Sequence, residues 1–486
     1  MFGLAVWDHR TKTLLLARDR AGEKPLFYTK VLGEVLFASE LQCLLRHPDV
    51  SRELDREAIA DYLALGYIPE PRTPFTAIRR VPAGTYMRFH HDGGEETVRY
   101  WDPTRFTLRV IDPAEAVRET QRLIENAVTK QVMSDVPVGV FVSGGLDSSI
   151  LATLASSAIG VDKVHTFSAQ FAEASYDESG DAAALALKMR TKHVPVRTDE
   201  ETLRDALQNV TERVAEPLAD PAILPTFLLA RTAREHVKVI LSGEGADELF
   251  GGYPTYLGHK IAPKYDALPS FLRAGAKKLA FAMPASGKKV TLEYLLKRFV
   301  TDAERPWSER HLRWFGTGLT ERVAQLVERE GDHPLVGAML LDYRSYLRDN
   351  LLVKVDRATM LSSVEARAPF LDRDVTAFAL SLPADLRVRG FTTKWVLKKA
   401  AEKWLPRDVI YRRKRGLSVP IAGWINRGLR AEVDRLLDPT RLRKRDLVDE
   451  PRVTALLAEH RSGHANHAKA LWAVVMLEYW LERWAV

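Results

Sequence analysis

The sequence predicts an α/β fold in which a parallel sheet with helical cover follows a strand-rich first segment. Three observations support this prediction. Short β-prone runs dominate up to about residue 100, apolar strands alternate with helical segments between residues 114 and 241, and the pattern beyond residue 256 is mostly helical. A chain of 486 residues, of which 46% are hydrophobic, is long enough for roughly two to four domains with large cores.

The charge balance is that of an ordinary globular protein. Lys and Arg number 71 and Asp and Glu 64, for a net charge of +7, and the 28% of charged residues are interleaved, which excludes a disordered or collagen-like chain. The densest basic run, Arg412-Arg413-Lys414-Arg415, is typical of a solvated loop, so we expect a nucleotide phosphate rather than nucleic acid as a partner. No apolar run approaches the ~20 residues that span a bilayer, and we expect no membrane partner.

The chain has a single cysteine, Cys43, and therefore no intrachain disulfide. This composition fits a reducing compartment, and we expect a cytoplasmic protein. Cys43 lies in the apolar stretch Leu41-Gln42-Cys43-Leu44-Leu45, which favours a small buried hydrophobe over a reactive thiol.

The first hundred residues have the pattern of short strands separated by turns. One helix interrupts them at residues 56–65, where Asp55 is the expected N-cap and apolar residues recur at helical spacing. Two Asp-Pro pairs, at residues 102–103 and 112–113, then indicate a linker. The expected strands are residues 4–7, 14–17, 34–37 and 84–90.

From residue 114 the pattern changes to strands that alternate with helices. Val117, Ile124 and Val128 lie on one helical face, and an apolar strand at residues 136–142 follows them. Alternation of this kind argues for a parallel sheet with helical cover. Further strands are expected at residues 163–171 and 237–241, and helices at residues 227–236 and 469–484.

The strand at residues 136–142 leads directly into Ser143-Gly144-Gly145-Leu146-Asp147-Ser148-Ser149. A strand that ends in Ser-Gly-Gly and restarts as a helix leaves backbone N–H groups at the helix N-terminus, where the helix dipole also favours an anion. The glycines allow close approach of a phosphate, the serines add hydroxyl donors, and Asp147 is a candidate ligand for Mg²⁺. The turn lacks the Lys-Ser/Thr ending of a Walker loop and does not belong to that class.

A second polar motif follows the strand at residues 237–241. It reads Ser242-Gly243-Glu244-Gly245-Ala246-Asp247-Glu248-Leu249-Phe250-Gly251-Gly252-Tyr253. Four glycines and three carboxylates at the carboxyl end of a strand suit a ligand crevice in a parallel sheet. The alternative, an acidic glycine-rich surface loop, is less favoured once both motifs are present.

Together the two motifs resemble those of glutamine-dependent asparagine synthetases, within the ATP pyrophosphatase superfamily. The resemblance extends over nearly the whole chain. It implies an ATP pyrophosphatase-type synthetase domain at residues 114–486, preceded by a partial, Ntn-hydrolase-like glutaminase domain at residues 1–105. It further implies that ATP and Mg²⁺ activate the side-chain carboxylate of aspartate as an adenylate, with release of pyrophosphate, and that ammonia then gives asparagine and AMP. Glutamine or free ammonia supplies the nitrogen, and a homodimer is a further expectation.

The resemblance also assigns roles to individual residues. Asp147 and Asp247 resemble the pair that holds Mg²⁺ on the departing pyrophosphate. Glu244 resembles the residue needed to form and use the adenylate, either by orienting the amine or by accepting a proton from ammonia. The residues expected to bind ATP and its pyrophosphate are Val142, Ser143, Gly144, Gly145, Asp147, Ser148, Ala169, Ser242 and Gly243.

Two later segments resemble further family blocks. The segment at residues 354–372 resembles a block that shapes the synthetase pocket, and within it Glu365 is either catalytic or the partner of Arg367 in a structural ion pair. The segment at residues 413–420 resembles a later block, in which Lys414 would stabilise charge on the phosphate during adenylation.

The front of the family's glutaminase domain has no counterpart in the sequence. The family uses an N-terminal cysteine as nucleophile, whereas position 2 here is Phe2, so no glutaminase site is assigned. A start site placed too far downstream and a natural loss that leaves an ammonia-dependent synthetase both explain this. We favour the misplaced start site, because a strand-rich remnant alone would expose unpaired sheet edges.

Two alternative functions remain open. Relatives of the family amidate or cyclise other carboxylates, although Glu244 favours asparagine synthesis because the β-lactam-forming relatives resemble this motif with tyrosine there. A catalytically degenerate scaffold subunit is the second alternative. The missing front is its only support, and the intact phosphate loop and acidic motif argue against it.

Overall fold

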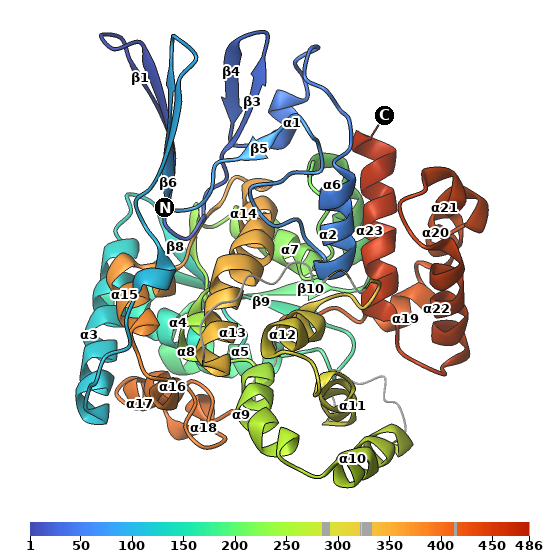
Figure 1. Cartoon of the computed structure of the whole chain (residues 1–486). Helices are drawn as coiled ribbons and strands as arrows, with labels where there is room; N and C mark the ends of the chain where they lie inside the picture. The colour runs from blue at the N-terminus through green and yellow to red at the C-terminus, as the bar shows by residue number, and fades with distance from the viewer. Residues whose placement is uncertain (284–291, 321, 323–332, 413–415, 486) are drawn as a thin grey trace.

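The computed structural model describes residues 1–283, 292–320, 322, 333–412 and 416–485. Its strands form two antiparallel sheets near the N-terminus and one five-stranded parallel sheet in the middle of the molecule (Figure 1). The α/β class predicted from the sequence, a parallel sheet with helical cover after a strand-rich segment, is confirmed.

The antiparallel sheets are built from the first hundred residues. In strand β6 (Thr85–His90), Thr85, Met87 and Phe89 are buried and the residues between them are half-buried, the alternation of a strand with one inner face. Helix α2 (Arg56–Leu65) begins where the Asp55 carboxylate accepts a hydrogen bond from the Ala58 N–H at 3.0 Å. One sheet has the order β1 (Gly3–Asp8), β2 (Thr13–Arg18), β6, β7 (Glu95–Arg99), and the other β4 (Glu34–Ala38), β3 (Phe27–Val31), β5 (Arg79–Arg80), with α1 at Leu41–Leu44.

The parallel sheet places the two polar motifs side by side. Its register pairs Val140 of one central strand with Leu241 of the next, so both strands end at the same edge. Val239 and Leu241 belong to one hydrophobic core and Ile240 to the other, as expected of a strand buried on both faces. The strand order is β10 (Lys192–Thr198), β9 (Val164–Phe171), β8 (Val138–Phe141), β11 (Val239–Leu241) and β12 (Glu365–Arg367).

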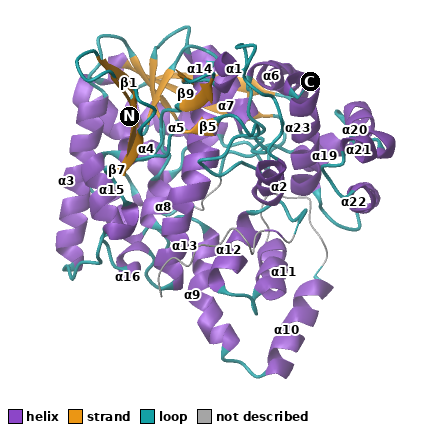
Figure 2. Cartoon of the chain, turned by 45° about the horizontal axis from the view of Figure 1, so that its top comes forward, coloured by secondary structure: helices purple, strands orange, loops and turns teal. Residues whose placement is uncertain are grey.

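Helices cover both faces of this sheet (Figures 1 and 2). On one face α4 and α5 pack against the strands and α3 packs on α4. On the other face α7 packs against β9 and β10, and α6 covers α7 and contacts the C-terminal helix α23. The bounds are α3 Pro113–Gln131, α4 Leu146–Ile159, α5 Ser179–Met189, α6 Glu200–Arg213, α7 Ile223–Ala233 and α23 Ala468–Trp484.

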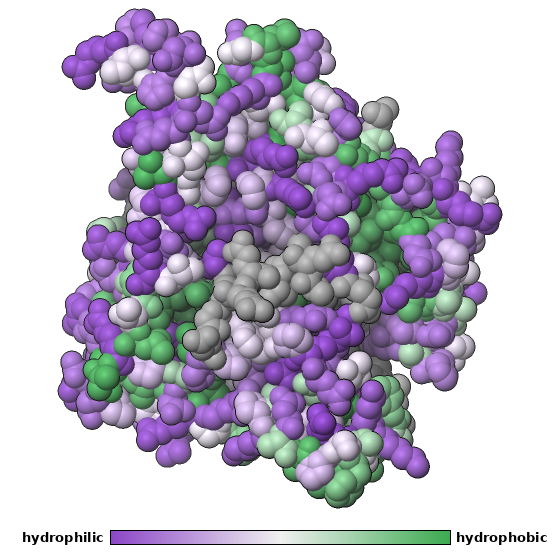
Figure 3. Space-filling view, in the orientation of Figure 1, coloured by the Kyte–Doolittle hydropathy of each residue, from purple (hydrophilic) through white to green (hydrophobic). Residues whose placement is uncertain are grey.

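Most of the remaining helices lie below and beside the sheet in Figure 1. Figure 3 shows apolar residues at the lower end of the molecule, where Phe271, Leu272 and Leu279 are exposed on α10. These helices are α8 Ala246–Phe250, α9 Pro254–Asp266, α10 Ser270–Ala282, α11 Leu292–Asp302, α12 Trp307–Phe315, α13 Pro334–Asp342, the π-helix η4 Tyr343–Leu351, α14 Leu352–Met360, α15 Arg373–Leu380, α16 Ala384–Arg387, α17 Trp395–Ala401, α18 Arg407–Ile410, α19 Ile421–Asn426, α20 Arg430–Leu436, α21 Pro439–Arg445 and α22 Glu450–Ser462, with short 3₁₀ turns η1 Pro103–Arg105, η2 Val161–Lys163 and η5 Pro369–Leu371.

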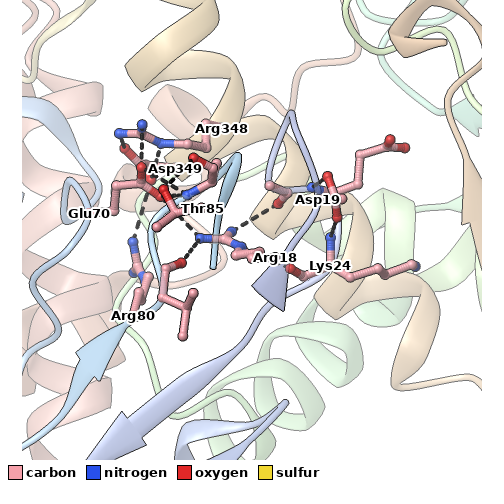
Figure 4. A network of polar contacts seen from close by, with 12 residues as sticks. Arg18, Asp19, Lys24, Glu70, Arg80, Thr85, Arg348 and Asp349 are labelled. Carbon is pink, nitrogen blue, oxygen red and sulfur yellow. Dashed lines mark hydrogen bonds and ion pairs between the residues drawn. The ribbon is translucent and has the colours of Figure 1, made fainter. Parts of the chain in front are cut away.

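Buried charges join the antiparallel sheets to the π-helix η4 (Figure 4). Arg80 of β5 contacts Glu216 and lies 3.6 Å from Asp349 of η4. Arg348 of η4 in turn lies 2.5 Å from Glu70, in the segment between α2 and β5. All five side chains are largely buried, so each charge depends on partners from the other part of the chain.

The structure agrees with most of the expected elements and corrects one residue. The seven expected strands match β1, β2, β4, β6, β8, β9 and β11, whereas β3, β5, β7, β10 and β12 were not predicted. The prediction that Cys43 is buried is wrong: the residue is exposed, because Leu41 and Leu44 fill the inner face of the short helix α1. Within the described residues, no helix is both long enough and apolar enough to cross a bilayer.

Candidate active site

A cavity of about 530 Å³ opens at the carboxyl edge of the parallel sheet. Both polar motifs contribute to it, as do residues at the ends of β8 and β9. In a parallel α/β sheet this edge is where ligands bind. Its lining residues include Val142, Ser143, Gly145, Asp147, Ser148, Ser168, Ala169, Tyr176, Asp220, Ser242, Gly243, Glu244, Asp247, Tyr346, Lys354, Lys394 and Arg412.

The turn between β8 and α4 is shaped for a phosphate. Gly145 caps the 14-residue helix α4, whose first-turn N–H groups and dipole favour an anion. Gly144 has φ +67°, and a Cβ there would lie 2.7 Å from the Cβ of Asp181. Only glycine is compatible with that conformation and that neighbour. Arg412 closes the turn from outside by donating to the Gly144 carbonyl at 2.8 Å.

The two aspartates of the motifs meet at one ammonium group. Lys394 Nζ lies 2.6 Å from Asp147 Oδ2 and 2.6 Å from Asp247 Oδ1. Burial alone would lower the pKa of Lys394, but the two carboxylates outweigh it and hold the pKa above its ordinary value. Lys394 therefore stays charged and pairs with both carboxylates at the mouth of the phosphate turn.

Glycine also makes room for this cluster. A Cβ on Gly252 would lie 1.7 Å from Asp247 Oδ1 and 2.3 Å from Lys394 Cε. The turn after α8 thus brings the backbone directly against the ion pair, and any side chain there would displace it.

The two carboxylates fit a Mg²⁺ ion. Asp147 Oδ1 is buried and has no hydrogen-bond partner within the part of the chain that the structure describes. Oxygen ligands of this kind suit Mg²⁺, which takes one or two carboxylates together with substrate phosphates. No group of three or more His, Cys, Asp or Glu side chains arranged for a metal occurs among the described residues.

A second lysine, Lys354, also lines the cavity. Lys354 of α14 is 3.4 Å from Asp220 and 3.8 Å from Glu244. Burial lowers its pKa, but the charges of Asp220 and Glu244 more than compensate and raise it above the ordinary value. Lys354 thus places a permanent positive charge beside the Glu244 carboxylate.

Glu248 lies behind this cluster as a buried carboxyl group. Burial, and then the neighbouring Asp247 charge, raise its pKa to about 8. The Tyr253 hydroxyl donates to Glu248 Oε1. Near neutral pH Glu248 is therefore mostly protonated, which limits the negative charge gathered around the two aspartates.

Comparison with known proteins agrees with this geometry. Residues 119–482 match the family model described as asparagine synthase, and residues 1–101 match the one described as a glutamine amidotransferase domain. The chain belongs to the asparagine synthase family. As a member with a glutamine amidotransferase segment, it is an ATP-dependent ligase of the amidotransferase type.

Curated relatives of the asparagine synthase family align over almost the whole chain. A Mycobacterium tuberculosis protein, provisionally named a glutamine-hydrolysing asparagine synthetase, is 34% identical over 99% of this chain and 76% of its own length. Glutamine-hydrolysing asparagine synthetase 1 of Bacillus subtilis is 30% identical over 99% of this chain and 77% of its own. The amidase chyE of Penicillium rubens is 26% identical over 92% of this chain and 74% of its own.

Most residues that the sequence assigned to the asparagine synthase site lie together. Gly144 is the exception in the phosphate turn, since it contributes its carbonyl to Arg412 rather than a cavity surface. Lys414 falls outside the described residues, although Arg412 and Gly416 line the cavity. The assigned residues that line the cavity are Val142, Ser143, Gly145, Asp147, Ser148, Ala169, Ser242, Gly243, Glu244 and Asp247.

Glu365 lies elsewhere. It begins β12, at the opposite end of the strand from the cavity edge, and its Oε1 accepts a hydrogen bond from Arg367 Nε at 2.6 Å. This geometry matches the structural ion pair rather than the catalytic alternative.

The sequence did not single out Lys354 or Lys394. Lys354 stands in a segment that resembles a family block, but nothing distinguishes it from the other charged residues there. Lys394 precedes α17 with φ 52°, and no motif marks it.

Proposed function

We propose that the chain catalyses the ATP-dependent amidation of aspartate to asparagine through a β-aspartyl-AMP intermediate. The observation that supports this proposal most strongly is the meeting of Asp147, Asp247 and Lys394 at the phosphate turn. A site of this kind holds a polyphosphate whose leaving portion carries several negative charges. The proposal divides the chain into a glutaminase-like part at residues 1–105 and a synthetase part at residues 114–486, in a cytoplasmic protein.

In the first step the substrate carboxylate attacks the α-phosphorus of ATP and pyrophosphate leaves. The N–H groups at the start of α4 hold the phosphates, and Lys394 neutralises charge that develops on the pyrophosphate. Asp147 and Asp247 would hold Mg²⁺, which supplies further positive charge to the phosphate oxygens. The adenine lies against the ends of β8 and β9, where Val142 donates its N–H to the Phe167 carbonyl at 2.9 Å.

In the second step ammonia attacks the acyl carbon of the adenylate and AMP leaves. The Glu244 carboxylate lines the cavity and accepts a proton from the attacking nitrogen. Lys354, 3.8 Å from Glu244, offsets the negative charge that forms on the acyl oxygen. The ammonia comes from glutamine or from solution.

The experiment measures pyrophosphate and asparagine after incubation of the chain with ATP, Mg²⁺ and ammonium, with and without aspartate. We expect pyrophosphate release that depends on aspartate and equals the asparagine formed. Glu244→Gln should lower the rate by about 10²–10⁴-fold, the usual contribution of a general base. Glu119→Gln, a matched change at a half-buried carboxylate of α3 that pairs with Arg122, should leave the rate unchanged.

Two outcomes would contradict the proposal. Pyrophosphate release that does not respond to aspartate would point to another carboxylate, and a Glu244→Gln variant as active as the parent would remove Glu244 from the mechanism. Glu365→Gln is informative in the same assay, because a large loss would favour the catalytic alternative for Glu365 over its ion pair with Arg367.

A further inference from the structure

A second, larger cavity adjoins the first. Its volume is about 860 Å³, and the two cavities share Tyr176, Asp220 and Tyr346 in their walls. Helices α11, α19 and α23 form much of the rest of the wall, with single residues from α2, α10, α12 and η4. A cavity of this size accommodates a complete small ligand, whereas the proposed chemistry requires only the substrate carboxylate at the ATP cavity.

Two cations meet in the wall of this second cavity. Lys469 Nζ donates to the carbonyl of Phe315, and Arg298 Nη2 donates to the next carbonyl, that of Gly316, at 3.3 Å. Lys469 is exposed, so its ammonium group is accessible to a ligand that enters the cavity. A bound anion would reduce the repulsion between the two cations.

The carboxylates of the same wall are paired with other residues. No ion pair joins Lys469 to a carboxylate within the described part of the chain. The observed pairs are Glu293 with Lys297 at 2.6 Å, Asp302 with Arg305 at 3.6 Å, and Asp220 with Lys354 at 3.4 Å.

Apolar side chains complete the wall around these cations. Trp472 and Ile421 line the cavity together with Lys469. The wall therefore combines a cation with an apolar surface.

We propose that the second cavity binds the non-reacting part of an acceptor larger than aspartate, with an anionic group of that acceptor at Lys469. The acceptor is then an extended carboxylate with at least one further negative charge, and its reacting carboxylate reaches the ATP cavity past Asp220 and Tyr346. This inference rests on the adenylation chemistry of the proposed function, since it requires a carboxylate to be adenylated at the first cavity, and it makes a larger aspartyl compound rather than free aspartate the preferred acceptor. Aspartate would occupy only the inner part of the site.

The test compares three acceptors that carry the same β-carboxylate: L-aspartate, L-aspartyl-L-glutamate and L-aspartyl-L-glutamine amide. Pyrophosphate release is measured with ATP, Mg²⁺ and ammonium. We expect kcat/KM for aspartyl-glutamate to exceed that for aspartate about tenfold, because the added anion gains a charge-assisted hydrogen bond. The neutral amide is similar in size to aspartyl-glutamate, and its kcat/KM should lie between the values for aspartate and for aspartyl-glutamate.

Variants of Lys469 separate the effect of its charge on acceptor preference from the effect of its side-chain shape. Lys469→Gln should lower kcat/KM for aspartyl-glutamate about tenfold, because one charge-assisted hydrogen bond is lost. It should lower kcat/KM for the neutral amide far less. Lys469→Arg should retain most of the preference. Lys444→Gln, on the exposed side of α21, is the matched control and should change none of the three values.

The outcomes distinguish this inference from the proposed function. If aspartate is used at least as well as both longer acceptors, or if Lys469→Gln lowers all three values equally, the inference is wrong and the proposed function stands. If no acceptor supports pyrophosphate release, the proposed function fails and the inference fails with it.

Discussion

At the scale of single residues, Lys394 is the group on which the proposed phosphate site depends. Its ammonium lies 2.6 Å from a carboxylate oxygen of both Asp147 and Asp247, and its side chain is buried. Without it the two carboxylates would repel each other and any incoming polyphosphate. With it, the site presents both the oxygens that suit Mg²⁺ and a fixed positive charge for the leaving pyrophosphate.

Replacing this lysine tests that role. Lys394→Met keeps the length of the side chain and removes the charge, and we expect pyrophosphate release to fall by about 10²–10³-fold, as for other groups that stabilise developing charge. Lys399→Met, five residues along on α17 and half-exposed beside Glu402, is the control and should keep the parental rate. A Lys394→Met variant that folds and retains the parental rate would show that pyrophosphate does not contact this residue.

Glu248 provides a prediction of pH dependence. Its pKa is about 8 in the folded protein and near the ordinary 4.5 in the unfolded chain, so the folded state binds the extra proton between these values. The stabilisation from the protonated form is therefore complete below pH 4.5 and is lost as pH rises through 8. We expect the unfolding midpoint of the parent to fall over this interval, and that of Glu248→Gln to fall less.

The measurement is thermal unfolding of both proteins across pH 5 to 9. Gln resembles the protonated acid and still accepts a hydrogen bond from the Tyr253 hydroxyl, so the variant should fold at neutral pH. Parallel pH profiles for the two proteins would mean that Glu248 is ionised in the folded state and that its neighbours accommodate the charge.

At the scale of elements, the turn after α8 fixes the distance between backbone and ion pair. Gly252→Ala would place a methyl group 1.7 Å from Asp247 Oδ1, so Asp247 or Lys394 must move. We expect an activity loss of about 10²-fold, since misplacement by an ångström costs that much in a positioned site. Pyrophosphate release is the measurement.

Gly275→Ala is the matched control for this change. Gly275 lies in α10, where an added Cβ would have no heavy atom within 4 Å, and alanine favours the helix. It should preserve activity and leave stability equal or slightly higher. Equal activity of Gly252→Ala and the parent would show that the turn can shift without disturbing the aspartates.

The sequence predicts those elements whose own residues show a recognisable pattern of apolar and turn-forming residues. The phosphate turn is contiguous, so Ser143, Gly145 and Asp147 could be read from it directly. The edge strand β10 was missed because Pro195 and its charged residues argue against a strand, and only its place at the sheet edge makes Pro195 acceptable. β12 is three residues long and too short to show a pattern.

The limits of sequence reasoning appear where distant elements meet. Lys394 and Lys354 reach the cavity from the start of α17 and from α14, far along the chain from both motifs. A lysine acquires such a role only from its folded neighbours, and no motif distinguishes either lysine in the sequence. The prediction that Cys43 is buried is wrong for the opposite reason. Its apolar neighbours Leu41 and Leu44 face the core, and Cys43 faces the solvent.

At the scale of the whole molecule, the antiparallel sheets and the synthetase part are held together by buried charges. Arg80 of β5 lies between Glu216 and Asp349, which come from the loop before α7 and from the π-helix η4. Glu216 also lies 3.3 Å from Arg357 of α14. Since η4 and α14 carry Tyr346 and Lys354 into the cavities, the same contacts that join the two parts also position the candidate active site.

Arg80→Ala is therefore expected to destabilise the molecule strongly. It would leave Glu216 and Asp349 short of a buried cation, and removing one partner of such a pair costs about 3–5 kcal/mol. Arg79→Ala next to it removes a half-exposed pair with Asp55, 3.4 Å away, and should cost only about 0–1 kcal/mol. Unfolding followed by urea and by heat gives the comparison. Because the loss of stability in Arg80→Ala arises from burial of the charges, high salt should reduce the small loss in Arg79→Ala and leave the loss in Arg80→Ala unchanged. Equal losses of stability in the two variants would mean that water reaches Glu216 and Asp349.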